Sequence, residues 1–179
     1  MVARAMDRSP EVDMVLHTHR SPMIYDRVRS GEYLMGICAG SAEIGDDLKS
    51  QEIMREPMVI IPSGLSSLKR RGTTEVITIE ERSPTWEAIA RRARKLNISP
   101  VRRLESFFAV AQAGIAGLGH ALVPYGVAKA LRIPPASLVS FHSDFSRPIT
   151  LVSRTSTLGR PFVQHVWEEM HRASKSVRF

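Results

Sequence analysis

The chain of 179 residues contains one cysteine, few aromatic side chains and no long apolar run. Because Cys38 is the only cysteine, an internal disulfide is excluded, as is typical of proteins in a reducing cytoplasm. No apolar stretch approaches the roughly 20 residues that a membrane-spanning helix requires. The first residues carry no apolar core of the kind that marks a secretory signal. We therefore expect a cytoplasmic protein without a membrane span.

Sequence signatures of enzymes are also missing. The Gly-x-Ser-x-Gly turn of serine hydrolases does not occur. The run "GIAGLG" at 114–119 lacks the preceding strand and the long following helix of a dinucleotide-binding fingerprint. His17 and His19 could lie on one side of a strand, but two ligands alone do not make a metal site. We predict no enzyme activity, no cofactor and no metal, and we rank a hydrolase with Ser83 as nucleophile below the alternatives given below.

Positive charge exceeds negative charge, and the formal net charge is +7. The only tight basic cluster, "ARRARK" at 90–95, has no aromatic residues interleaved with it, as a platform for single-stranded nucleic acid would require. On a helix this cluster lies opposite Trp86, Ile89 and Leu96, which is typical of a solvated face. We favour that interpretation over a nucleic-acid contact. The charge is also compatible with an anionic ligand.

What the sequence does contain is an alternation of short apolar runs and amphipathic segments. Apolar or β-branched runs predict strands at 12–18, 33–40, 57–64, 76–80, 120–124, 137–141 and 148–154. Helical periodicity, with Ser or Pro at the start and Gly at the end, predicts helices ending before Pro10 and at Leu131, and helices over 22–31, 83–98, 106–116 and 159–174. Strands separated by helices predict an α/β protein with mainly parallel sheets.

Two segments interrupt this alternation where a boundary between lobes is expected. They are "IIPSG" at 60–64 and "FHSDFSRP" at 141–148. Two crossings give a hinged pair of lobes, which we place at 1–61 with 146–179 (lobe I) and at 62–145 (lobe II). Ligands of α/β proteins bind at the carboxyl ends of strands, so we expect a ligand there.

Four motifs occur in a recognisable order: "YDRVRSGEYLMGICAG" (25–40), "REPMVIIP" (55–62), "AGLGHALVP" (116–124) and "RPITLVSR" (147–154) before a last amphipathic helix. Together they resemble the effector-binding domain of LysR-type transcriptional regulators, over nearly the whole chain. The resemblance implies an α/β fold of two Rossmann-like lobes joined by a double-crossover hinge, similar to type 2 periplasmic binding proteins. Gly117 would cap a helix in the left-handed conformation, and Gly119 would let helix and sheet approach closely.

The sequence departs from the family pattern in three respects. Leu34 stands where the family usually has an acidic residue. The chain begins inside the first helix, so we expect the first strand of lobe I to be missing. We also find no N-terminal helix-turn-helix, so DNA binding in the family's usual way would require a winged helix-turn-helix domain absent from this sequence.

The resemblance also implies a small effector between the lobes, held by hydroxyl groups and helix N-termini. The matching candidates for ligand binding are Ser21, Ser83, Thr85 and Ser106, with Arg20 and Arg82 as added charge. A helix N-terminus suits a carboxylate or a similar anion. The serines are also explained as ordinary helix caps, and both roles are compatible. Cys38 lies in an apolar run and is expected to be a buried, unreactive side chain.

The predicted function is therefore that of the regulatory domain of a LysR-type transcription factor. It would bind a small anionic metabolite in an interlobe cleft and act through the arrangement of a homodimer or tetramer. The segments near 1–8, 12–18, 85–95 and 106–113 would form the dimer contact in the family's manner. The alternative is a stand-alone solute-binding protein or a truncated decoy of the same fold without a DNA role.

Overall fold

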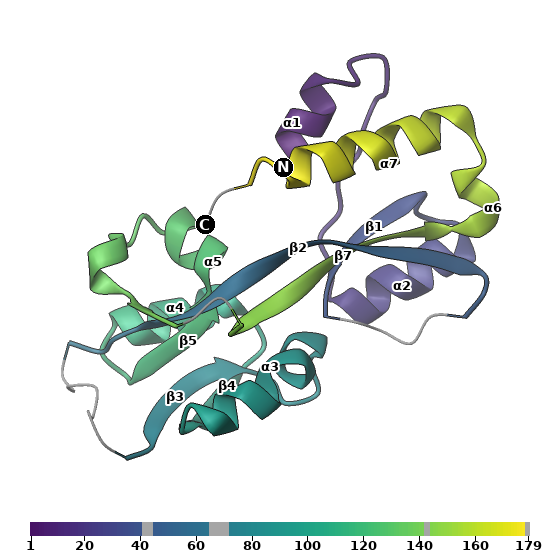
Figure 1. Cartoon of the computed structure of the whole chain (residues 1–179). Helices are drawn as coiled ribbons and strands as arrows, with labels where there is room; N and C mark the ends of the chain where they lie inside the picture. The colour runs from purple at the N-terminus through teal and green to yellow at the C-terminus, as the bar shows by residue number, and fades with distance from the viewer. Residues whose placement is uncertain (41–44, 65–71, 142–143, 178–179) are drawn as a thin grey trace. The chain divides into compact units, whose positions relative to one another are not determined.

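Strands β2 (Leu48–Ile61) and β7 (Ser146–Arg154) each run through two separate units of the chain (Figure 1). The structure is a computed structural model, and it describes residues 1–40, 45–64, 72–141 and 144–177. Unit 1 comprises Met1–Arg55 and Pro148–Arg178, and unit 2 comprises Glu56–Arg147. Both crossings thus lie inside strands. The predicted segment 60–64 begins at the end of β2, and the predicted segment 141–148 contains the second crossing, between Arg147 and Pro148; residues 142 and 143 lie outside the described residues.

Unit 1 has a small sheet with helices on both faces. Its elements are β1 (Met35–Ala39), parts of β2 and β7, α1 (Val2–Asp7), α2 (Ser21–Ser30), α6 (Thr155–Leu158) and α7 (Pro161–Ser174). β1 pairs antiparallel with β7, from Met35 opposite Ser153 to Ala39 opposite Ile149. Successive side chains of a strand point to opposite faces, so Leu151 packs with Trp167 of α7 and Val152 packs with Val28 of α2.

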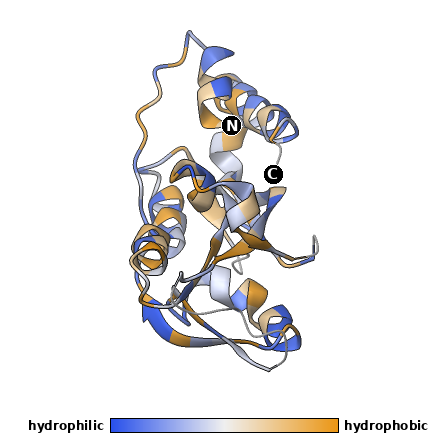
Figure 2. Ribbon diagram, turned by 90° about the vertical axis from the view of Figure 1, so that its left-hand side faces the viewer, coloured by the Kyte–Doolittle hydropathy of each residue, from blue (hydrophilic) through white to orange (hydrophobic). Residues whose placement is uncertain are grey.

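Unit 2 is built on a mixed sheet. Its further elements are β3 (Thr74–Ile79), α3 (Pro84–Lys95), β4 (Ile98–Leu104), α4 (Phe107–Ile115), β5 (His120–Pro124), α5 (Tyr125–Ala130), the 3-10 turn η1 (Pro135–Ser137) and β6 (Val139–Ser140). β3 pairs parallel with β4 and with β5, whereas β2 pairs antiparallel with β5 and β6. Figure 2 shows orange, hydrophobic strand segments in the sheet and blue, hydrophilic stretches on helices.

The two faces of this sheet bury two apolar clusters. On one face Ile60, Val76 and Leu122 pack against Trp86 and Ile89 of α3. On the other face the cluster contains residues of α4 and α5: Val59, Ile61, Ile77, Val110, Ala111, Ala121, Val123 and Ala128. The alternation of neighbouring residues between the clusters explains why these strands are apolar without interruption.

The alternation of helices and strands predicted from the sequence is confirmed, but three details are wrong. The pairing is not mainly parallel, because β2 and β7 run against their neighbours β5 and β1. Residues 12–18 form no strand; Val15 and Leu16 are 75% and 62% exposed, so no buried face fixes a register. The third difference is strand β4, which the sequence pattern does not predict because Pro100 and two arginines interrupt its apolar residues. It is the last strand in the sheet order, a place where proline is tolerated.

The glycines of the segment after α4 have separate structural roles. Gly117 has φ +83°, its N–H donates to the Gly114 carbonyl (3.0 Å) and the Leu118 N–H donates to the Ala113 carbonyl (2.9 Å). This is the Schellman arrangement, and it confirms Gly117 as the left-handed cap. Gly119 has φ +151°, a conformation that L side chains rarely adopt. The close approach of helix and sheet lies at Gly114, where an added Cβ would stand 2.6 Å from the Ala121 Cβ, and not at Gly119.

Among the described residues, none of the helices combines the length and the apolar character needed to cross a bilayer.

Candidate functional site

Helices α3, α4 and α5 of unit 2 begin at one edge of its sheet. Strands β3, β4 and β5 run parallel, and each is followed directly along the chain by one of these helices. Because the carboxyl ends of parallel strands share an edge, the three helix starts share it as well. β2 is antiparallel to β5, with Met58 opposite Pro124, so the beginning of its unit-2 half lies at the same edge.

Two of the predicted serines cap helices at this edge. The Ser83 hydroxyl oxygen accepts from the Trp86 N–H (3.1 Å) at the start of α3. The Ser106 hydroxyl oxygen accepts from the Phe108 N–H (3.2 Å) at the start of α4. Ser83 is buried and Ser106 is exposed. In both cases the hydroxyl hydrogen takes no part in the cap, so each serine can still donate to an anion beside the partial positive charge of the helix end.

Thr85, the third predicted residue of this edge, contacts an arginine that the sequence reasoning missed. Its hydroxyl oxygen accepts from Nη1 of Arg147 (3.1 Å). Nε and Nη2 of Arg147 also donate to one carboxylate oxygen of Glu56, at 2.9 Å and 2.7 Å. The side chains of Arg147 and Glu56 are 16% and 10% exposed, so this is a nearly buried ion pair. Each partner of a buried ion pair depends on the other, because either charge alone would be costly to keep away from water.

Backbone and aromatic groups complete the surroundings of this pair. The other carboxylate oxygen of Glu56 accepts from the Gly126 N–H (2.9 Å) in the first turn of α5. The guanidinium carbon of Arg147 lies 5.3 Å from the centre of the Phe107 ring at the start of α4. Through Thr85, Phe107 and Gly126, the pair therefore joins the starts of all three helices. We call Glu56, Thr85, Phe107, Gly126 and Arg147 the buried cluster.

The sequence contained a signal for this cluster. Glu56 and Arg147 each stand beside a long apolar strand run, in "REPMVIIP" and "SRPITLVSR". A charged residue at such a position has to be paired when it is buried. Sequence alone could not show that these two charges, 91 positions apart, pair with each other.

The remaining candidates have different surroundings. Arg82 is exposed directly before the Ser83 cap. In unit 1, Ser21 is the first residue of α2, and its hydroxyl donates to the Ala39 carbonyl (3.2 Å) and accepts from the Ala39 N–H (3.1 Å). Arg20 is exposed and is the N-cap residue of α2, without a side-chain cap bond. Because the Ser21 hydroxyl hydrogen is bound to the carbonyl of Ala39, the last residue of β1, it is not available for a ligand.

His17, His19 and His120 have structural partners. The ring of His17 stacks on that of Tyr33 with a centroid distance of 5.2 Å, and His19 Nε2 lies 2.8 Å from the Tyr33 hydroxyl. The His120 Nδ1 accepts from the Ser63 N–H (3.0 Å) in unit 2. Within the described ranges, no three His, Cys, Asp or Glu side chains are grouped so that they could hold a metal ion.

Cys38 is 1% exposed in β1. Burial raises the pKa of its thiol from 9.0 to about 11, while hydrogen bonds with Tyr25 and Ser21 lower it. The folded chain therefore holds this proton more tightly than the unfolded chain, and Cys38 makes the free energy of unfolding fall as the pH rises from 9 to 11.

We expect Cys38 to react with Ellman's reagent at pH 8 at least about 100-fold more slowly in the folded chain than in urea, because the thiolate fraction is lower and access is blocked. The absorbance of the released thiol measures both rates. Equal rates would contradict the burial of this side chain.

The family model described as "LysR substrate binding domain" matches residues 1–175. The chain belongs to this family. The resemblance seen in the sequence motifs is thereby confirmed. LysR substrate-binding domains are the effector-binding parts of transcriptional regulators.

A curated relative supports the same assignment. An uncharacterized HTH-type transcriptional regulator of Vibrio cholerae is 29% identical over 169 residues, which are 93% of this chain. The LysR substrate-binding chain described here spans 58% of that relative's length.

Solved structures show the same fold. The sulfate-bound regulatory domain of an OxyR2 mutant from Vibrio vulnificus matches with a TM-score of 0.75 at 19% identity, over 98% of this chain and 87% of that chain. The CcmR regulatory domain of Synechocystis in complex with 2-PG matches with a TM-score of 0.73 at 16% identity, over 98% and 90% of the two chains. The effector-binding domain of QuiR in complex with shikimate has a TM-score of 0.75 at 13% identity, over 99% and 92%. The predicted fold class, similar to LysR effector-binding domains, is therefore confirmed.

Proposed function

We propose that this LysR-type effector-binding domain binds a small anionic metabolite at the edge of unit 2 where α3 and α4 begin. The observation that carries the proposal is that two capped helix N-termini, at Ser83 and Ser106, directly follow the neighbouring parallel strands β3 and β4. Each N-terminus carries the partial positive charge of its helix; Pro84, the first residue of α3, has no N–H, and the serine caps bind the Trp86 and Phe108 N–H groups. The exposed guanidinium of Arg82 adds a full charge next to the first of them.

The buried cluster has a positioning role in this proposal. The Arg147 guanidinium is already neutralised by Glu56, so it adds little net charge for a ligand. It does fix Thr85 at the second position of α3 and the Phe107 ring at the first position of α4. Thr85 keeps its hydroxyl hydrogen as a donor. Ser21 and Arg20 lie in unit 1 and stay ligand-binding predictions from the sequence; the hydroxyl hydrogen of Ser21 is bound to the Ala39 carbonyl.

The proposal extends to the whole protein. Relatives bound to shikimate and 2-PG support a small organic acid as effector, and full-length CbnR in complex with its target DNA supports a DNA-binding partner domain outside this chain. We place the protein in the cytoplasm, as a homodimer or tetramer without catalytic activity. Of the segments expected at the dimer contact, 12–18 offers the apolar side chains of Val15 and Leu16 and 106–113 offers that of Phe108, which are 75%, 62% and 52% exposed. The effector would act by binding one arrangement of protomers better than another.

Thermal shift measurements with small carboxylates, aromatic acids, amino acids, sulfate and phosphate test the site. Ser83→Gly and Ser106→Gly remove the hydroxyl groups and cost only a few tenths of a kcal/mol in capping. We expect a ligand that raises the Tm of the wild type to bind each variant about tenfold more weakly, because one charge-assisted hydrogen bond is lost.

Ser137→Gly is the matched control, since Ser137 is an exposed serine of unit 2 in η1. This control is expected to keep the full ligand-induced rise in Tm. A ligand that stabilises Ser83→Gly and Ser106→Gly as much as the wild type would contradict the proposed site.

A further inference from the structure

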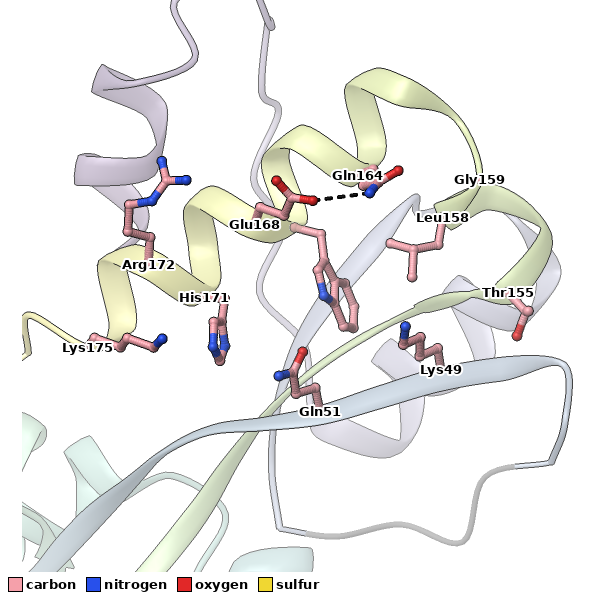
Figure 3. A pocket seen from close by; sticks show the side chains of 11 residues that line it. Lys49, Gln51, Thr155, Leu158, Gly159, Gln164, Glu168, His171, Arg172 and Lys175 are labelled. Carbon is pink, nitrogen blue, oxygen red and sulfur yellow. Dashed lines mark hydrogen bonds between the residues drawn. The ribbon is translucent and has the colours of Figure 1, made fainter.

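Unit 1 contains a pocket of about 660 Å³ that lies apart from the residues assigned to the effector (Figure 3). It is lined by residues of β2, α6 and α7 and by the residues that follow these two helices, Gly159 and Lys175; all of them belong to unit 1. Its volume falls within the range of about 300–1,000 Å³ that is typical of small-molecule sites, and it is far larger than a single inorganic ion requires.

The pocket lies beside the place where β2 and α7 pack together, because the neighbouring residues of both elements have polar side chains. Ile53 of β2 and Trp167 of α7 belong to one apolar cluster. Gln51 and Lys49 precede Ile53 at alternate positions, so the three side chains lie on the same face of β2. Figure 3 shows both side chains directed from β2 toward α7. On α7 the lining residues recur with helical spacing, at Gln164, Trp167, Glu168 and His171, and Lys175 follows as the C-cap residue.

The charge of the lining is predominantly positive. It contains the cations Lys49, Arg172 and Lys175 against the single carboxylate of Glu168. Glu168 accepts a hydrogen bond from Gln164 Nε2 (3.1 Å), and Arg172 is paired with Glu169. In the described part of the chain, neither Lys49 nor Lys175 has an ion-pair partner. Figure 3 shows these two lysines on opposite sides of the pocket, with Gln51 between them.

We propose that this pocket binds a small planar dicarboxylic acid, as a second site separate from the proposed effector site. Each carboxylate would pair with one of the two lysine ammonium groups, which act as point charges for anions. The Gln51 amide would serve polar substituents of the ligand body. The Trp167 indole, which lines the pocket in a residue 6% exposed, would contact its flat apolar part.

The chain has two tryptophans, Trp86 in unit 2 and Trp167 in this pocket. Once Trp86 is replaced, the fluorescence of Trp167 reports on this pocket alone. In a Trp86→Phe variant, Trp167 is the only source of indole fluorescence. We expect benzene-1,4-dicarboxylate to change this fluorescence saturably, after correction with free tryptophan, and the uncharged benzene-1,4-dicarboxamide to leave it unchanged. The same titration of the wild type by NMR, following its two indole N–H signals, provides the measurement if Trp86→Phe folds poorly.

Charge variants decide whether the two lysines make the site. Lys49→Gln together with Lys175→Gln is expected to weaken binding of the dicarboxylate by about tenfold or more. Lys95→Gln, on α3 of unit 2, is the control and should leave the affinity unchanged. The absence of a saturable change at Trp167, or equal affinity in the wild type and the double variant, would overturn the proposal. Neither result would bear on the Ser83 and Ser106 site, which the thermal-shift variants test separately.

Discussion

Replacing Arg147 by methionine is expected to lower the free energy of unfolding by about 3–5 kcal/mol. Methionine keeps the unbranched apolar stem but removes the guanidinium, which donates to Glu56 and to Thr85. The Glu56 carboxylate, 10% exposed, would then keep only the Gly126 N–H as a described partner. A carboxylate left buried without its countercharge is far more costly than the loss of an exposed ion pair.

Urea unfolding of Arg147→Met and of Arg55→Met measures this difference. Arg55 pairs with Glu52 at 3.1 Å, but the two side chains are 52% and 43% exposed, so its loss should cost at most about 1 kcal/mol. Adding Glu56→Gln to Arg147→Met should recover part of the loss, since the uncompensated charge is removed. A loss for Arg147→Met no larger than that for Arg55→Met would contradict the structural weight given to the buried cluster.

Replacing Gly114 by alanine is expected to destabilise the chain by about 1–3 kcal/mol. In most helices a change from glycine to alanine is stabilising by about 0.5–1 kcal/mol, because alanine restricts the unfolded chain. At Gly114 the added Cβ would lie 2.6 Å from the Cβ of Ala121 and 3.5 Å from its backbone nitrogen. Helix α4 would have to move away from β5, and the cluster around Val110 and Val123 would lose packing.

The partner substitution Ala121→Gly tests this explanation directly. It removes the opposing Cβ, so Gly114→Ala should be much less harmful in that background. A double-mutant cycle, measured by urea unfolding, gives the coupling between the two sites. A stabilising Gly114→Ala, or a coupling near zero, would show that the helix and the sheet are not in close contact at this position.

The parts of the fold that the sequence predicted are those determined by local interactions. Ser83 and Ser106 cap their helices by bonds to residues two or three positions away. Gly31 and Gly117 end helices in the left-handed conformation, which L residues with a side chain disfavour. Such signals lie within a few residues of sequence, so periodicity and composition reveal them.

The parts that it did not predict depend on distant partners. Residues 12–18 have a strand-like composition, but a strand forms only where another strand and a buried face receive it. β4 is a strand despite Pro100, because it pairs with β3 on one side only in the sheet order. The Glu56–Arg147 pair and the unit 1 pocket likewise bring together residues far apart in the sequence. Their chemistry is visible in the sequence, but their proximity is not.

The most direct test of the proposed effector site is an amide NMR titration of the assigned chain with the anion that gives the largest thermal shift. The Trp86 and Phe108 N–H groups are the amides that the two caps hold. The proposal predicts that these amides and their neighbours in the first turns of α3 and α4 shift together and saturate with one dissociation constant. An anion that binds the chain, as shown by calorimetry, while leaving both first turns unshifted would contradict it.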